Sequence, residues 1–393
     1  MRLYLGDNIL VTPDALARFA WSAPMRDLAL KVGISDVGLK KLLRGFGIPT
    51  PPQGHWNRVH AGRPVPGPPE ADPRGPGETG RIVLDPRFRS LVEESEPMPV
   101  DGPFASTKVP EDLDALRQQE LKAIGHVGIP RDLTTPHVGL VGLLEKEEAK
   151  RREAAEKEWY WNKPAFDTPL GQRQLKLLNA LFLALARRGH SASAKDDNGN
   201  LAIECCIGGR TLRLSFSVVG KHPTRLVRGR HLPAGDLPAS TPLRLAIDRE
   251  FRSSVTSSWQ DGREDRLERK LAAIAADVIV AGEAAFRQGL LEALEWEQQR
   301  RRWDEERKRE ERGALEAKRL KDLRRSGELL AEAEEIRRLV ARLKAAMVTR
   351  GSEMDSGTVE RWERWALAQA DQLDPVLSGQ VLSHLFVPEL DEA

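Results

Sequence analysis

Apolar positions near the beginning of the chain repeat at the three- and four-residue spacing of amphipathic helices. Among them, residues 25–44 (MRDLALKVGISDVGLKKLLR) fit the register of a helix-turn-helix. In that register Ala29 is the small residue at the helix crossing, Gly33 supplies the positive φ of the turn, and Ser35 caps the second helix. The inward apolar contacts fall to Leu28, Val32, Leu39 and Leu42. The pattern predicts a compact helical domain over residues 1–60.

Proline and glycine interrupt the apolar pattern directly after this domain. Residues 62–80 contain six Pro and five Gly, a composition that disfavours a packed core. We therefore expect a linker that lets the N-terminal domain move. The linker and an extended segment together cover residues 61–135, with a short strand at 82–84 and a helix at 110–124.

The next part of the chain, residues 136–260, combines helical and strand patterns. It opens with a charged helix over 138–161, and a second helix with leucines at helical spacing ends at Gly189. Strand-like runs follow, bounded by the turn sequence DDNGN, by Gly208-Gly209 and by a polar loop: SASAK, LAIECCI, TLRLSFSVV and LRLAI. These patterns predict a central α+β domain.

From about residue 261 the pattern is helical and has the spacing of a coiled coil. Two heptad seams, in which apolar residues alternate four and three positions apart, are separated by a break at Ser326-Gly327. The first heptad seam is Leu267, Leu271, Ile274, Val278, Ala281 and Ala285, and the second is Leu329, Ala333, Ile336, Val340, Leu343 and Met347. We expect coiled-coil helices over 261–350, then a last helix and tail over 351–393.

The partner of these long helices is left open by the pattern. They pair with a second copy of the chain, with the helix at 138–161, or with the 328–347 segment folding back at Gly327. Residues 295–325, which hold twelve basic and nine acidic side chains, have almost no apolar face. Their later part, 304–325, fits a solvated spacer helix.

Composition favours several small cores rather than one large globule. Of the 393 residues, 40% are hydrophobic and 31% charged, and Gly and Pro are frequent at 32 and 26 positions. We predict a mainly α chain with a small α+β central domain, an N-terminal helix-turn-helix, and long C-terminal helices that form a coiled coil.

The charge of the whole chain hides a local imbalance. A formal charge of +2 excludes a uniformly basic nucleic-acid binder. Residues 1–65, however, carry nine Lys and Arg against four Asp, and several of these cations fall on the second helix of the predicted helix-turn-helix. The first domain by itself is therefore basic.

This basic helix supplies the candidate DNA contacts. Lys and Arg neutralise phosphates, Lys41 or Arg44 can reach a guanine edge, and Ser35 and Asp36 suit hydroxyl, amide or cytosine-amine contacts. The alternative is a structural helix pair with solvated cations. The candidates are Ser35, Asp36, Val37, Lys40, Lys41 and Arg44 on the outer face, with Arg26, His55 and Arg58 flanking it. Trp56 either lies along the DNA with this flank or caps the small core.

The segment WSAPMRDLALKVGISDVGLKKLLRGFGIPTPPQGHW resembles the N-terminus of a family of uncharacterised bacterial proteins with a helix-turn-helix and a coiled coil. In that family a Trp-x-x-Pro, the helix-turn-helix and an Ile-Pro-x-Pro-x-Gly-Tyr-Trp segment follow in order, and His55 stands where Tyr is usual. Four further blocks are similar: PHVGLVGLLE, the helix before RGHS, SSWQDGREDRLERKL and WERWALAQADQLDP. Such proteins are often found near mobile genetic elements, and the resemblance implies no established activity.

Other chemistry has weaker support in the sequence. We find no metalloprotease, P-loop, dinucleotide or zinc-finger spacing, and therefore expect no metal and no cofactor. Glu204, Asp248 and Glu250 could form a nuclease-like site with Lys221, or they are edge charges of a half-buried sheet. The basic loop 221–230 could be a second nucleic-acid contact.

The cysteines and the hydropathy pattern suggest a compartment. Cys205 and Cys206 are adjacent in a strand, so their side chains point to opposite faces and cannot form an ordinary disulfide. The longest apolar run, residues 177–186, is too short for a bilayer span. We expect a cytoplasmic protein that does not contact membranes.

The sequence thus favours a non-enzymatic protein that reads double-stranded DNA through its helix-turn-helix. Its coiled coil would form a homo-oligomer or recruit a partner protein, as in a transcriptional regulator or accessory factor. Two alternatives remain: an accessory subunit of a mobile-element or phage-defence complex, and a nucleic-acid enzyme with its centre in residues 190–250.

Overall fold

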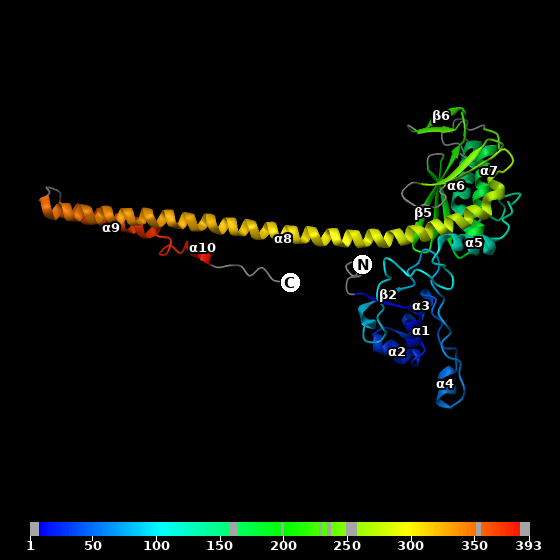
Figure 1. Cartoon of the computed structure of the whole chain (residues 1–393), viewed down its shortest axis with the longest axis horizontal. Coiled ribbons are helices and arrows are strands. Elements are labelled where there is room, and N and C mark those ends of the chain that lie inside the picture. The colour runs from blue at the N-terminus through cyan, green and yellow to red at the C-terminus, as the bar shows by residue number, and fades with distance from the viewer. Residues whose placement is uncertain are drawn as a thin grey trace. The chain divides into compact units, whose positions relative to one another are not determined.

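The computed structural model is mainly α with some β, and 56% of it is helical (Figure 1). It divides into two compact units, Met1–Glu295 (unit 1) and Trp296–Ala393 (unit 2), and helix α8 (Leu267–Arg350) contributes to both. No helix among the described residues combines the length and apolar composition of a bilayer span. The structure describes residues 8–156, 164, 166–197, 200–227, 230–233, 237–248, 258–350 and 355–385.

The N-terminal domain of unit 1 packs helices against a two-stranded ribbon. The strand predicted at 82–84 is confirmed, and it pairs antiparallel with an earlier strand, with Ile9 opposite Leu84. The sequence predicted only helices for residues 1–60, so the earlier strand is a departure from that prediction. The elements are β1 (Ile9–Val11), α1 (Pro13–Ala20), α2 (Met25–Val32), α3 (Asp36–Gly45), α4 (His55–His60), β2 (Ile82–Leu84) and a 3-10 turn, Pro86–Phe88.

The core of this domain joins side chains that are far apart in the sequence. Leu16 of α1 and Leu39 of α3 are fully buried in the same cluster as Leu84 and Phe88. The ring of Phe88 meets that of Phe19 edge-on, with their centroids 5.8 Å apart. The ribbon and the 3-10 turn are therefore integral parts of the domain.

Part of the proline- and glycine-rich segment is packed, although its composition predicts a free linker. Arg74 is held by Glu283 of α8, with Nη2 and Nη1 at 2.7 and 3.2 Å from the two carboxylate oxygens. The Arg74 and Glu283 side chains are 5% and 0% exposed. Glu283 also accepts from the Gly77 amide at 2.8 Å and from Arg287 at 2.8 Å. We call this cluster the α8 clasp; it fixes residues 74–77 because a buried charge needs its partners.

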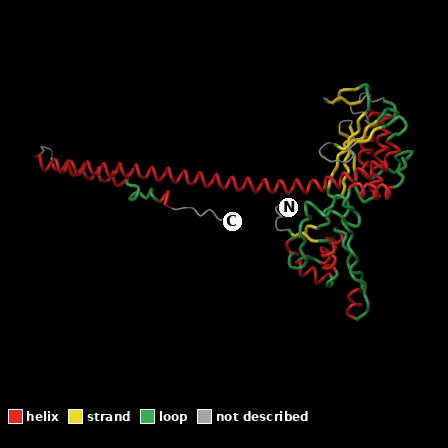
Figure 2. The backbone as a smooth tube through the Cα atoms, viewed as in Figure 1, coloured by secondary structure: helices red, strands yellow, loops and turns green. Residues whose placement is uncertain are grey.

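The central domain is built on an antiparallel sheet, drawn in yellow in Figure 2. The sheet has five strands in the order β3-β4-β5-β8-β9. The four predicted strands are confirmed, and β9 is an additional edge strand. The predicted polar loop contains two further strands, β6 and β7, which pair antiparallel with Val227 opposite Arg230. The strands are β3 (Ser191–Asp197), β4 (Asn200–Ile207), β5 (Arg210–Val218), β6 (Thr224–Val227), β7 (Arg230–Pro233), β8 (Leu243–Ile247) and β9 (Ser258–Gln260).

Helices cover one face of this sheet. The predicted helix ending at Gly189 is α7 (Pro169–Arg187), and Gly189 has the expected positive φ of 83°. The predicted helix at 138–161 is α6 (Val138–Glu156), which packs on β3, and its expected end lies outside the described residues. The helix predicted at 110–124 is α5 (Leu113–Ile124).

The first heptad seam is buried against the sheet and does not form a coiled coil. Its members join the core of the central domain with α7 and the strands. Gly282 permits this close approach, because a Cβ there would lie 2.4 Å from the Cβ of Ile207 in β4. A heptad pattern records an apolar face but not its partner, which explains why the coiled-coil prediction was wrong for this segment.

In unit 2 the second heptad seam belongs to a helical hairpin (Figure 2). Helix α9 (Ser356–Leu373) lies along the end of α8, and Arg337 bonds Asp371 at 2.9 Å and Asp374 at 3.0 Å. Ala333 and Val340 are buried at 0% and 3% exposure. A short helix, α10 (Leu382–Leu385), follows.

The break predicted at Ser326-Gly327 is wrong, because α8 continues through it. Ser326 is buried, and its hydroxyl lies 3.0 Å from Nε2 of His384. A single glycine in a helix costs only about 1 kcal/mol, which such packing can offset. Folding back at Gly327 is thereby excluded.

The α8 clasp predicts a large effect of one buried carboxylate. Glu283→Ala should lower the free energy of unfolding by about 3–5 kcal/mol, because it leaves two arginines without their shared partner. Amide hydrogen exchange at Gly77 should accelerate. The control Glu93→Ala removes an ion pair with Arg18 in which Glu93 is 77% exposed, and should cost less than about 1 kcal/mol. Equal losses in urea denaturation would contradict this account.

Candidate nucleic-acid interface

The turn between α2 and α3 has the geometry that the sequence predicts. Gly33 adopts the left-handed conformation at φ 75°, directly after the last residue of α2. The Ser35 hydroxyl accepts a hydrogen bond from the Gly38 amide at 3.0 Å and so caps α3. Both roles predicted from residue type are confirmed, and together they fix the start and the direction of the second helix.

The inward faces of the two helices also follow the prediction, with one exchange. Leu28, Val32 and Leu39 are buried, and Ala29 is 2% exposed at the crossing. On α3 the fourth inward residue is Leu43, which is fully buried, whereas Leu42 is only half-buried. Leu43 follows Leu39 by four residues, and positions four apart lie on the same side of a helix. This spacing was the available signal for choosing Leu43.

The outer face of α3 presents the predicted contact residues to solvent. Asp36, Lys40, Lys41 and Arg44 are exposed, and Val37 is 71% exposed. Positions 37, 40, 41 and 44 follow one another at the spacing of a single helix face. Arg26 on α2 and Arg58 on α4 are exposed as well. The structure thus brings one apolar and three basic side chains of α3 together on one surface, which we call the α3 face.

The cations of the α3 face have no counter-ion among the residues that the structure describes. No ion pair joins Lys40, Lys41 or Arg44 to any of them. By contrast, Arg18 of the same domain contacts Glu93 at 2.8 Å. Arg87 likewise contacts Asp85 at 2.8 Å, and its hydrogen bonds hold the Asp85 pKa below its ordinary value. Positive charge is left uncompensated on one side of the domain.

His55 does not belong to this surface, which corrects its predicted role as a DNA contact. Its side chain is buried between Trp21 and Trp56, whose ring centroids lie 5.2 and 5.0 Å from its own. Trp21 donates its indole N–H to the Pro49 carbonyl at 2.8 Å. These contacts fold the proline-rich extension back onto the domain.

The carboxylates considered for catalysis make local bonds. Glu204 faces Arg213 across the sheet with 3.8 Å between their charged atoms, and Asp248 accepts from the Ser215 hydroxyl at 2.8 Å. Lys221 is exposed, and Glu250 lies outside the described residues. No group of three His, Cys, Asp or Glu side chains suited to a metal occurs in the described part of the chain.

The two cysteines are free thiols with different surroundings. Cys205 is fully buried, and burial raises the pKa of its thiol to about 12. Cys206 is half-buried on the opposite face of β4. Their opposite orientation agrees with the strand prediction, and Cys205 is protonated and unreactive at neutral pH.

Comparison with protein-family models, with curated proteins and with solved structures found no match. The family resemblance of the N-terminal segment therefore stays a prediction.

The capping bond of Ser35 gives a direct test of the local geometry. Ser35→Ala should lower the free energy of unfolding of the N-terminal domain by about 1 kcal/mol, because the Gly38 amide loses its acceptor. Ser35→Asp keeps an acceptor and adds a favourable charge at the helix N-terminus, so it should retain wild-type stability. An equal loss for both variants in thermal unfolding would show that the hydroxyl does not cap α3.

Proposed function

We propose that the protein binds double-stranded DNA by inserting α3 into the major groove. The observation that carries this proposal is the α3 face, with three unpaired cations and an exposed valine on the second helix of a helix-turn-helix. All four side chains of the α3 face are exposed, so the packing of the domain does not depend on them. An external polyanion would supply the missing negative charge.

The side chains of the α3 face suit distinct parts of a duplex. Lys40 and Lys41 are flexible point charges that neutralise phosphates, and the planar guanidinium of Arg44 can bond a guanine through two parallel hydrogen bonds. Val37 offers apolar contact to a thymine methyl group. Asp36, at the start of the helix, suits a cytosine amine. The same surface therefore provides both non-specific affinity and the means to read bases.

Removing two of these cations should weaken DNA binding in a salt-dependent way. Lys40→Ala combined with Arg44→Ala should reduce affinity for a labelled duplex about tenfold or more at low salt. It should also lower the slope of log affinity against log salt by about 2, since two phosphate contacts are lost. Fluorescence anisotropy between about 50 and 200 mM salt measures both quantities.

The matched control for this test removes the same charge from another side of the domain. Arg18→Ala combined with Arg87→Ala deletes two arginines that already have carboxylate partners. Affinity and salt slope should stay close to the wild-type values. If both double variants lose affinity equally, the effect is one of net charge, and the α3 face is not the DNA-binding surface.

We also propose that unit 2 joins two copies of the chain. Leu320, Leu323 and Leu330 of α8 are 49%, 55% and 40% exposed, and with Gly327 they recur at three-four-three spacing. This stripe is distinct from the second heptad seam, which packs with α9. Exposed apolar residues at coiled-coil spacing favour association with another helix. A dimer would present two helix-turn-helix units, which suits a transcriptional regulator or an accessory factor of a mobile-element complex.

Charged substitutions in this stripe should separate the two copies. Leu323→Glu with Leu330→Glu should convert a dimer to a monomer in sedimentation equilibrium at micromolar concentration, while helicity stays unchanged because both side chains are exposed. Val348→Glu, at a residue that is 90% exposed on the same helix, is the control and should leave the dimer intact. A wild-type monomer would refute the proposed association.

A further inference from the structure

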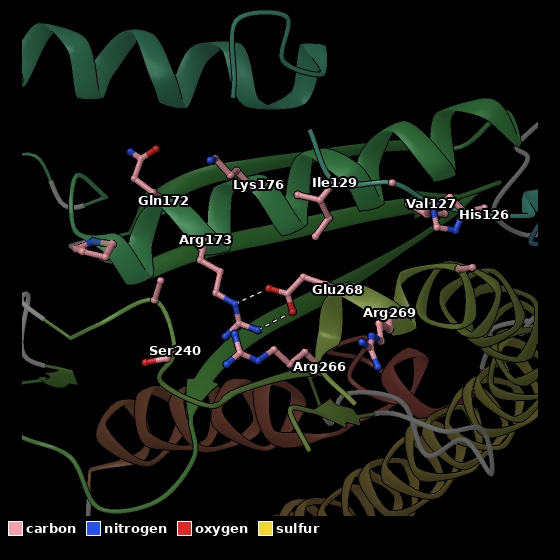
Figure 3. Close-up of a pocket in the computed structure, with 14 residues that line it drawn as sticks. His126, Val127, Ile129, Gln172, Arg173, Lys176, Ser240, Arg266, Glu268 and Arg269 are labelled. Atoms are coloured by element: carbon pink, nitrogen blue, oxygen red, sulfur yellow. Dashed lines mark hydrogen bonds and ion pairs between the residues drawn. The ribbon is translucent and has the colours of Figure 1, made fainter. Parts of the chain in front are cut away.

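A pocket of about 670 Å³ lies in the central domain, where the beginnings of α7 and α8 meet (Figure 3). Gln172, Arg173 and Lys176 come from α7, Glu268 and Arg269 come from the start of α8, and Arg266 directly precedes α8. This volume is typical of small-molecule sites. Neither the α3 face nor the proposed association stripe contributes to it.

One wall of the pocket is held rigidly by Arg173. Its guanidinium bonds both oxygens of Glu268 at 2.6 and 2.8 Å and both oxygens of Asp261 at 2.8 and 2.9 Å. A further bond goes to the Thr241 carbonyl at 3.1 Å. Burial raises the pKa of Glu268, but the bonds from Arg173 outweigh this effect and keep that pKa below its ordinary value. Glu268 stays ionised, and both of its oxygens are occupied.

The other cations of the pocket are not neutralised by acids that line it. Lys176 donates to the Arg131 backbone carbonyl at 2.6 Å, and Arg269 donates to the Glu264 backbone carbonyl at 3.0 Å. The Arg266 guanidinium makes no side-chain bond with any residue in the described part of the chain. Carbonyl groups orient a cation but do not cancel its charge.

The charge balance of this site favours an anion. Four cationic side chains of the lining face one lining carboxylate, that of Glu268. Asp261 bonds Arg173 from outside the lining and Asp132 interacts electrostatically with Lys176, so positive charge is still in excess. The N-terminal ends of α7 and α8 add the positive poles of two helix dipoles to the same region. A phosphate monoester carries a charge of about −1.5 to −2 at neutral pH.

The other residues that line the pocket indicate which kind of organic group carries the phosphate. Val127, Ile129, Pro169 and Ala272 form apolar wall, and Gln172 and Ser240 offer polar groups beside it. We infer that this pocket binds a small organic phosphate of about the size of a mononucleotide. Lys176, Arg266 and Arg269 supply the positive charge that attracts its phosphate, and the apolar wall contacts its organic part.

The inference is tested by calorimetric titration of the full chain with four probes: adenosine monophosphate, ribose 5-phosphate, adenosine and inorganic phosphate. The first two should bind and raise the melting temperature, and adenosine should not bind. Arg269→Ala and Lys176→Ala should each weaken the binding about tenfold, because each removes a positive charge from the lining of the pocket. Both residues are at the surface of the pocket, so the variants should keep the wild-type melting temperature without ligand.

Two controls make the result specific. Lys122→Ala removes an exposed lysine of α5 that does not line the pocket, and should leave binding unchanged. The Lys40→Ala, Arg44→Ala variant should also bind as the wild type does, which separates this site from the α3 face. The inference is overturned if neither organic phosphate binds, if adenosine or inorganic phosphate binds as tightly as adenosine monophosphate, or if Arg269→Ala binds like the wild type.

Discussion

Unit 1 depends on acidic side chains of α8 that each hold an arginine from an earlier part of the chain. Glu283 binds Arg74 of the proline-rich segment, Asp277 binds Arg117 of α5, and Glu268 binds Arg173 of α7. Asp277 also accepts the Trp259 indole N–H at 2.9 Å. Burying such charges is costly unless every partner is in place, so these pairs specify which segments lie on α8 and in what register. The sheet, the packed end of the linker and the pocket between α7 and α8 are all fixed by this arrangement.

The helix-turn-helix was the most predictable part because its signals are local. The positive φ of Gly33, the cap of Ser35 and the inward leucines all lie within twenty residues, and neighbouring residues determine each of them. Exposure of the α3 face follows from the same helical period. The prediction that His55 contacts DNA was wrong because its partner Trp21 precedes both helices in the sequence, whereas His55 follows them. No local sequence pattern indicates a contact between two residues so far apart.

Features that depend on distant segments could not be predicted. The first heptad seam was recognised as apolar, but its partner is a sheet formed by residues that precede it, and spacing alone cannot distinguish a sheet from a helix. The pocket joins Lys176 to Arg269, about ninety residues apart, and neither lies in a recognisable motif. Arg74 lies in a segment whose composition predicts a linker, and only the folded chain brings it to the buried carboxylate of Glu283.

The β1–β2 ribbon determines when the N-terminal domain can fold during synthesis. Because Ile9 pairs with Leu84 and Phe88 completes the core, the helix-turn-helix leaves the ribosome well before its last core residues do. Until then its apolar surface stays open to solvent and to other chains. The domain therefore has a high contact order for a helical module. It should fold more slowly than a three-helix bundle in which the contacting residues are close together in the sequence.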